Sequence, residues 1–298
     1  MRSRVCQRLD PRERLVVERS AVDGPDHHQP RAAGFGLATA TGMTFPDRLI
    51  DDAPAQLRAW QAAAPMIAPA DRLVSARIAT GLGVFSSQAL TDLYSLIYET
   101  TDPDDLAETP AFQLRLAFVG KDLDTKLAAM RRLWTPSQQP LDQQASRALL
   151  GRAATLIAPD ADLQTDAPNL IASMLAAGFD RDAARWSRAV SQMDDQYSDQ
   201  AWAMLALGAP DGSGVDLSVS RISDFIDRDE SQGHKRSALL VAGLAGLGRI
   251  DAETAGRLSS RFGLRLGHRS SWTRLIDRAG GIGLRFKADG RGGSGPAR

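Results

Sequence analysis

The chain has 298 residues, of which 43% are hydrophobic and 24% charged, and this is enough apolar material for the core of one large or two modest domains. Its formal net charge is zero, and residues 43–280 carry 25 basic and 30 acidic side chains, so we expect no basic folded surface and no nucleic-acid binding. The single cysteine, Cys6, excludes an internal disulfide and a cysteine-based metal cluster.

The N-terminal sequence and the hydropathy of the chain bear on its location. The first ten residues contain no apolar stretch of the kind that a secretory signal needs, so the protein as written is expected to be cytoplasmic, and exported only if the true N-terminus differs. The longest apolar segment, residues 238–248, falls well short of the about 20 residues that span a bilayer. We therefore expect a buried helix there and no membrane span.

The two ends of the chain differ in composition from the middle. Residues 1–42 have neither helical nor strand periodicity, and residues 281–298 are rich in glycine, so both are predicted to be disordered tails. The abrupt change suggests a gene model that starts too early and ends in a truncation or a frame shift. The helical domain is expected over residues 43–280, and a sub-division near residues 159–166 is an open alternative.

In the first half of the domain, helix follows helix. Each begins at a capping side chain or at a proline, and apolar residues then recur with helical spacing. The expected start residues are, in chain order, Pro46 or Pro54, Pro69, Ser86 or Ser87, Thr109, Asp124 and Pro140.

The second half repeats this pattern, and the whole chain is expected to contain about a dozen helices. The expected start residues are Asp166, Asp180, Ser198 or Asp199, Asp216, His234, Asp251 and Ser270 or Ser271. Only residues 215–219 and 264–266 resemble short strands, and neither has a partner nearby. The fold class is therefore predicted to be all-α.

Several helix pairs are joined by a short turn that contains glycine, at Gly83, Gly120, Gly178 and Gly248. Such turns produce antiparallel helical hairpins. Their spacing straddles the 33–47 residues of common helical repeats without a fixed period. The expected architecture is an irregular α-solenoid, or superhelix, of stacked hairpins.

One hairpin carries a family resemblance. The segment from Ala177 to Val190 resembles the second half of a tetratricopeptide repeat, with Gly178, the following aromatic Phe179 and the small Ala183 in matching places. Leu170 also matches, whereas Ile171 stands where that family has a small residue. The resemblance covers residues 166–190, and it implies a scaffold whose concave face binds peptides or proteins. The wider segment also resembles uncharacterised bacterial helical proteins.

Motifs for chemistry are missing or incomplete. The glycines at residues 34–36 lack the third glycine of a dinucleotide site, and residues 160–166 lack the glycine and the closing glutamate of a calcium loop. None of the four histidines has a helical metal-binding partner. We therefore assign no catalytic, cofactor-binding or metal-binding residue, and no cofactor.

The resulting functional hypothesis is a non-catalytic helical scaffold that binds a protein or peptide. An exposed tryptophan beside an arginine would suit a binding hot spot, which makes Arg185, Trp186 and Arg188 the candidate partner-binding residues, although core packing is the simpler interpretation of Trp186. Two alternatives stay open. One is an α-superhelical enzyme or carbohydrate-binding protein with a carboxylate site formed in three dimensions. The other is an inactive fragment of a longer protein.

Overall fold

The structure is a computed structural model that describes residues 36–37, 39–42, 53–134 and 139–263. Contacts divide the chain into two compact units, Met1–Val215 and Asp216–Arg298. Residues 159–166, the alternative site of a sub-division, lie inside the first unit. The predicted tail at residues 281–298 lies outside the described residues, as does most of the predicted tail at residues 1–42.

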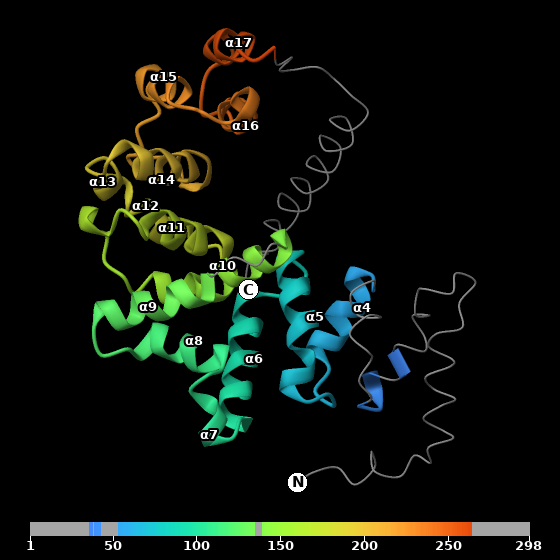
Figure 1. The fold of residues 1–298 in the computed structure, drawn as a ribbon. Coiled ribbons are helices and arrows are strands. Elements are labelled where there is room, and N and C mark those ends of the chain that lie inside the picture. The colour runs from blue at the N-terminus through green and yellow to red at the C-terminus, as the bar shows by residue number, and fades with distance from the viewer. Residues whose placement is uncertain (1–35, 38, 43–52, 135–138, 264–298) are drawn as a thin grey trace, which may run out of the picture. The chain divides into compact units, whose positions relative to one another are not determined.

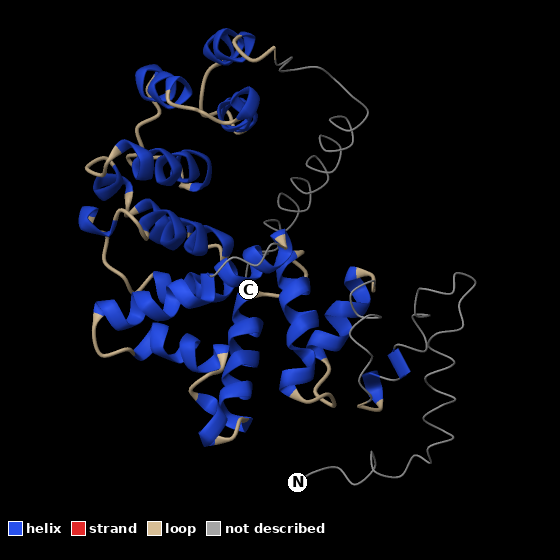
Figure 2. Cartoon of the chain, in the orientation of Figure 1, coloured by secondary structure: helices blue, strands red, loops and turns tan. Residues whose placement is uncertain are grey.

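The described residues are helical with connecting loops, and they contain no strand (Figure 2). The all-α prediction is therefore confirmed for them. In the first unit the helices are α4 (Ala55–Ala63), α5 (Pro69–Gly81), α6 (Ser87–Thr100), α7 (Pro103–Leu106), α8 (Pro110–Val119), α9 (Leu123–Trp134), α10 (Pro140–Ala154), α11 (Ala167–Ala176), α12 (Asp180–Ala184), α13 (Ser187–Val190) and α14 (Asp195–Gly208). In the second unit they are α15 (Val219–Asp227), α16 (Lys235–Gly246) and α17 (Ala252–Ser260).

Several expected helix starts are confirmed by hydrogen bonds. The side chains of Ser86, Thr109 and Asp251 each accept a hydrogen bond from the backbone N–H three residues later, as N-caps do. Pro69 and Pro140 each occupy the first turn of a helix. These residues place the starts of α5, α6, α8, α10 and α17 where the sequence predicts them.

Other expected caps are wrong in detail. Asp122, rather than Asp124, accepts the hydrogen bond from Thr125 N at the start of α9. Asp216 accepts from Ser218 N in the loop, so that Ser218 caps α15 and residues 215–218 form no strand. Neighbouring Asp and Ser residues compete for the same N–H donors, and spacing alone does not decide between them.

The same local competition changes two further starts. Asp166 precedes α11 without capping it, because its carboxylate is held by Arg131 at 2.8 and 2.5 Å. Helix α14 begins at Asp195, three residues before the expected Ser198. The helix expected from Ser270 or Ser271 and the strand-like residues 264–266 lie outside the described residues.

Three of the four expected glycine turns share one geometry. Gly83, Gly178 and Gly248 have φ values of 75°, 81° and 68°, a left-handed conformation that other residues adopt only at a cost. In each turn the next N–H bonds back to a carbonyl five residues earlier, as in the bond from Phe179 N to Met174 O at 2.8 Å. Each turn thus ends its helix with the usual left-handed cap and reverses the chain. Gly120 is different, since its φ of −51° lies in the ordinary region.

Helix α10 lies at the centre of the first unit. It has buried residues on every side, including Ala145, Leu149 and Leu150, and it packs against both α5 and α11 (Figure 1). Two glycines allow these backbones to approach closely. A Cβ added at Gly81 would overlap the backbone of Leu141, and one added at Gly151 would overlap the Ala177 side chain and the Ser173 carbonyl.

The packing order inside the first unit bears on the predicted solenoid. In a solenoid each repeat contacts only its neighbours. Helix α10, however, packs against α5, α6 and α8 as well as against α9 and α11. The helices α5, α6, α8 and α9 therefore form a bundle around α10. From α10 through α11 to α14 the packing follows chain order.

The hairpin with the tetratricopeptide resemblance has a broken second helix. A single helix was expected from Asp180 through Val190, but α12 ends at Ala184 and α13 begins at Ser187. The reason is local. The N–H groups of Arg185 and Trp186 bond to carbonyls only three residues back, a tighter pattern that interrupts the α-helix.

Two aspartates of the second unit, Asp229 and Asp251, lie just before α16 and α17 and accept hydrogen bonds at the starts of these helices. Asp229 accepts hydrogen bonds from Ser231 N (2.9 Å), Ser237 N (2.9 Å) and Ser237 Oγ (2.6 Å). It therefore satisfies a backbone donor in the first turn of α16, where His234 takes the N-cap position with φ 48°. Asp251 caps α17 in the usual way.

No helix in the described segments is both long enough and apolar enough to cross a membrane.

Candidate functional site

A groove runs between α6 and α8, with a volume of about 380 Å³. This lies in the range of roughly 300–1,000 Å³ that is typical of ligand pockets. The groove is lined by seven residues of α6 and five of α8, which are Gln88, Thr91, Asp92, Tyr94, Ser95, Tyr98, Glu99, Ala111, Leu114, Arg115, Phe118 and Val119. The α6 residues are spaced so that they share one helix face.

The floor of the groove is apolar and aromatic. Tyr94, Ala111 and Leu114 are buried beneath it, and the half-buried rings of Tyr98 and Phe118 form part of its walls. Tyrosine presents a large rigid apolar surface at a small cost in side-chain entropy, which suits it to binding surfaces. The floor is therefore suited to an apolar side chain.

The rim of the groove is polar and exposed. Asp92 accepts a hydrogen bond from Gln88 at 2.8 Å, and Glu99 lies two turns further along α6. Arg115 places its guanidinium over the Tyr98 ring, 5.0 Å from the ring centroid. This cation–π contact orients both side chains at the mouth of the groove.

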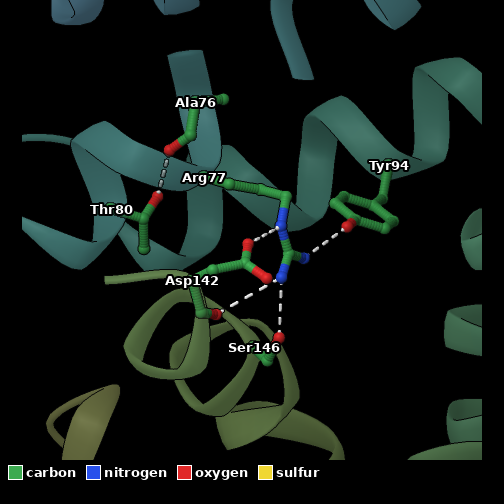
Figure 3. A network of polar contacts seen from close by, with 6 residues as sticks. All are labelled: Ala76, Arg77, Thr80, Tyr94, Asp142 and Ser146. Carbon is green, nitrogen blue, oxygen red and sulfur yellow. Dashed lines mark hydrogen bonds and ion pairs between the residues drawn. The ribbon is translucent and has the colours of Figure 1, made fainter. Parts of the chain in front are cut away.

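A partly buried polar network fixes Tyr94 in the floor (Figure 3). The Arg77 guanidinium, on α5, donates to Tyr94 Oη at 2.8 Å and to Asp142 Oδ1 of α10 at 2.5 Å. It also donates to the Asp142 carbonyl at 3.3 Å and to Ser146 Oγ at 2.7 Å. One side chain thus ties α5, α6 and α10 together behind the groove.

The electrostatics of the network keep Arg77 charged. Burial opposes the charge, but the hydrogen bond to Asp142, the negative charge of Asp142 and the hydrogen bond to Tyr94 raise the pKa of Arg77 above its ordinary value. Burial raises the pKa of Tyr94, an effect that Arg77 partly offsets, so the phenol stays neutral at physiological pH. The network therefore acts as a fixed support at neutral pH.

The chain around the groove is strongly acidic. Between Arg77 and Arg115 it contains no lysine or arginine, but it has six acidic residues, namely Asp92, Glu99, Asp102, Asp104, Asp105 and Glu108. All six are exposed. Two lie on the groove rim, and four lie in the connection from α6 to α8, which follows the end of the groove near Glu99. Apart from Arg115, whose guanidinium lies over Tyr98, the charged residues that border the groove are acidic.

The comparisons with known proteins add no relative to this description. No family model, curated protein or solved structure matches the chain.

The residues predicted for partner binding lie elsewhere in the first unit, and they do not share one exposed surface. Trp186 is only 1% exposed and is among the largest fully buried side chains, so its ring packs in the core and is not a surface hot spot. Arg185 is exposed, 3.7 Å from Asp182, and Arg188 is exposed on α13. Without an aromatic anchor between them, the two arginines form an ordinary charged surface.

Several acidic residues, including one of the six at the groove border, have local roles in the structure. Asp102 caps α7, Asp160 accepts from Asp162 N, and Asp229 supports α16. Across the part of the chain that the structure describes, no three His, Cys, Asp or Glu side chains are grouped as metal ligands would be. A pocket lined by two inward-facing acids would favour an enzyme, whereas Asp92 and Glu99 lie on an exposed rim.

The groove was not predicted from the sequence, although two features of the sequence are consistent with it. Tyr94 and Tyr98 are four residues apart on one predicted helix, and the next basic residue after Arg77 is Arg115. The helical spacing of Tyr94 with Leu90, Leu93 and Ile97 indicates a buried position, which is correct for its ring. The opening above that ring depends on how far α8 lies from α6, and a one-dimensional pattern does not encode that distance.

Proposed function

We propose that this protein is a non-catalytic helical scaffold, and that the groove between α6 and α8 binds a basic, amphipathic segment of a protein partner. The observation that carries the proposal is the coincidence of an aromatic, apolar floor with an acidic border that contains no basic residue between Arg77 and Arg115.

The floor and the border select different parts of the partner. An apolar side chain seated against Tyr98 and Phe118 leaves water, and burying such a side chain contributes about 1.5–3 kcal/mol. Lysine or arginine residues beside that anchor would face Asp92, Glu99 and the acidic connection between α6 and α8. Charge complementarity of this kind favours encounter and excludes acidic segments.

The mode of binding fits the fold. An amphipathic segment whose apolar face enters a groove between helices is a recurring form of peptide recognition. The tetratricopeptide-like resemblance at residues 166–190 supports the scaffold part of the proposal by analogy, because such scaffolds commonly bind peptides. The proposed binding residues are those of the groove, and they replace Arg185, Trp186 and Arg188.

The test uses two fluorescent peptides of about 15 residues, long enough to form a helix in a groove. One alternates leucine and lysine with helical spacing, and the other carries glutamate in place of lysine. Fluorescence anisotropy with the full-length protein should show saturable binding of the lysine peptide, weakening as salt is raised because salt screens exposed charges. The glutamate peptide should not bind.

Two tyrosine variants locate the site. Tyr98→Ala removes the wall of the groove and the contact with Arg115, and it should weaken binding of the lysine peptide about tenfold, the effect of losing roughly 1.4 kcal/mol. Tyr197→Ala, on α14 and outside the groove, is the matched control and should bind as the wild type does. Equal binding of both peptides, or an unchanged affinity in Tyr98→Ala, would refute the proposal.

Photo-crosslinking provides a second test in cells. A benzoylphenylalanine placed at Ser95, an exposed residue that lines the groove, should crosslink to a partner, and the crosslinked segment should be basic. The same group at Leu156, which is 51% exposed and lies away from the groove, should not capture that partner.

A further inference from the structure

A second, smaller cavity lies between α9, α10 and α11 in the first unit, with a volume of about 180 Å³. It is lined by Trp134, Gln143, Ser146, Arg147 and Asn169. None of these residues belongs to the groove described above, so the inference below is independent of the proposed function.

The cavity contains hydrogen-bond donors that the fold does not use. The side chains of Arg147 and Asn169 are half-buried, and neither has a hydrogen bond or an ion pair with any other part of the described chain. Ser146 Oγ accepts from Arg77 at 2.7 Å, so its own O–H is left to donate to an occupant of the cavity. Because Arg147 and Asn169 are only half-buried, their donors are also accessible to a ligand that supplies acceptors.

The other polar groups near the cavity are already committed. Trp134 Nε1 donates to Ser173 Oγ at 2.9 Å, which fixes the indole ring as a wall. The two nearby carboxylates, Asp142 and Asp166, are paired with Arg77 and Arg131 respectively. No carboxylate lines the cavity, so the charge of Arg147 is not balanced within it.

We propose that this cavity binds a small carboxylate. The Arg147 guanidinium presents two parallel N–H groups that match the two oxygens of a carboxylate, and the amide of Asn169 and the hydroxyl of Ser146 supply neutral donors. One unbalanced positive charge suits a monoanion better than a phosphate dianion. The volume admits a ligand about the size of a small amino acid, whose apolar part would lie against Trp134.

The experiment follows the Trp134 indole N–H by two-dimensional ¹H–¹⁵N nuclear magnetic resonance of the full-length protein, with the resonance assigned from Trp134→Phe. The probes are N-acetylglycine, its neutral amide N-acetylglycinamide, and inorganic phosphate. N-acetylglycine should shift the indole resonance saturably. The neutral amide should not, because it lacks the charge that pairs with Arg147, and phosphate should bind more weakly than the carboxylate.

Variants of the cavity complete the test. Arg147→Gln should weaken binding of N-acetylglycine about tenfold or more, and Arg147→Lys should also weaken it, since lysine keeps the charge but loses the bidentate geometry. Arg152→Gln, on the same helix but outside the cavity, is the matched control and should leave binding unchanged. Circular dichroism verifies that each variant folds.

Three results would overturn the inference. They are equal shifts by N-acetylglycine and its amide, wild-type affinity in both Arg147 variants, and phosphate binding tighter than that of the carboxylate. The last result would show an oxyanion site of a different class. Because none of these measurements involves the groove, their failure leaves the proposed peptide site untouched.

Discussion

The hydrogen bonds of the Asp229 carboxylate predict that this residue stabilises the start of α16 in the second unit. This side chain is 8% exposed and accepts hydrogen bonds from Ser231 N, Ser237 N and Ser237 Oγ. Ser237 is fully buried, and its N–H lies in the first turn of α16, where no earlier helical carbonyl is available to accept it. The substitution Asp229→Asn keeps the shape of the side chain and removes its charge.

The magnitude follows from the geometry. An asparagine has only one acceptor oxygen, so when that oxygen faces Ser237 the Ser231 N–H meets an amide donor and loses its partner. Losing one hydrogen bond to a charged acceptor costs about 1.5–3 kcal/mol, and the two remaining bonds also weaken because they are no longer charge-assisted. We therefore expect Asp229→Asn to destabilise the start of α16 by about 2–3 kcal/mol at neutral pH.

The effect depends on pH in a defined direction. Burial alone would raise the pKa of Asp229, but the hydrogen bonds from Ser231 and Ser237 outweigh it and hold the pKa far below its usual range. A group whose pKa is lower in the folded state stabilises that state above its unfolded pKa, about 3.9 for aspartate, and loses this contribution as the pH falls towards the folded pKa. The difference in stability between wild type and Asp229→Asn should thus be full at pH 7 and shrink below about pH 4.

Hydrogen exchange measured by mass spectrometry on the full-length protein is the suitable assay, because it reports local opening in a chain with two units. A loss of 2–3 kcal/mol corresponds to exchange about 30- to 150-fold faster at the start of α16. Asp227→Asn is the control, since Asp227 lies on the surface 2.8 Å from Arg261, and exposed pairs contribute about 1 kcal/mol or less. Equal exchange in the wild type and Asp229→Asn, or an equal effect of both substitutions, would refute the reasoning.

Three further predictions concern glycines in α10 and α17, the Arg77 network and the groove. Gly151→Ala should lower the free energy of unfolding by about 1–3 kcal/mol, because the added Cβ would overlap Ala177 and the Ser173 carbonyl. Gly256→Ala should raise the stability of α17 by up to about 1 kcal/mol, because its Cβ would meet open space. Thermal unfolding of each variant distinguishes the two. Asp142→Ala should cost about 3 kcal/mol because it leaves the Arg77 guanidinium, 18% exposed, without its counter-charge, and a double-mutant cycle with Arg77→Met should recover part of that loss in urea unfolding. In the peptide assay, Tyr98→Ala should weaken binding of the lysine peptide without changing the fold. A circular dichroism spectrum identical to that of the wild type would show that the fold is intact.

Much of the fold can be predicted from the sequence because helix signals are local. Ser86, Thr109 and Asp251 each cap the helix that follows them, and Gly83 and Gly178 end their helices as expected. These features depend on hydrogen bonds within a few residues, so the pattern contains the information needed to place them.

The parts that could not be predicted depend on distant contacts. Nothing in the sequence near Arg77 indicates that it lies against Asp142, which is 65 residues away along the chain. The contact belongs to the packing of α5 against α10, which distinguishes the bundle from helices stacked in chain order. Trp186 shows the same limit, since an aromatic residue among arginines fits an exposed hot spot and a buried anchor equally well until its neighbours in space are known.

Helix α10 has a consequence for the recognition of distant homologues. Buried residues occur around its whole circumference. Ala145, Ala148 and Ala153 are small and buried, and a Cβ at Gly151 would overlap Ala177 and the Ser173 carbonyl. Larger residues are excluded by steric overlap there, whereas exposed positions elsewhere are free to diverge. A homologue too remote to align along its length should still show this spacing of alanine and glycine, followed by a second helix with proline in its first turn.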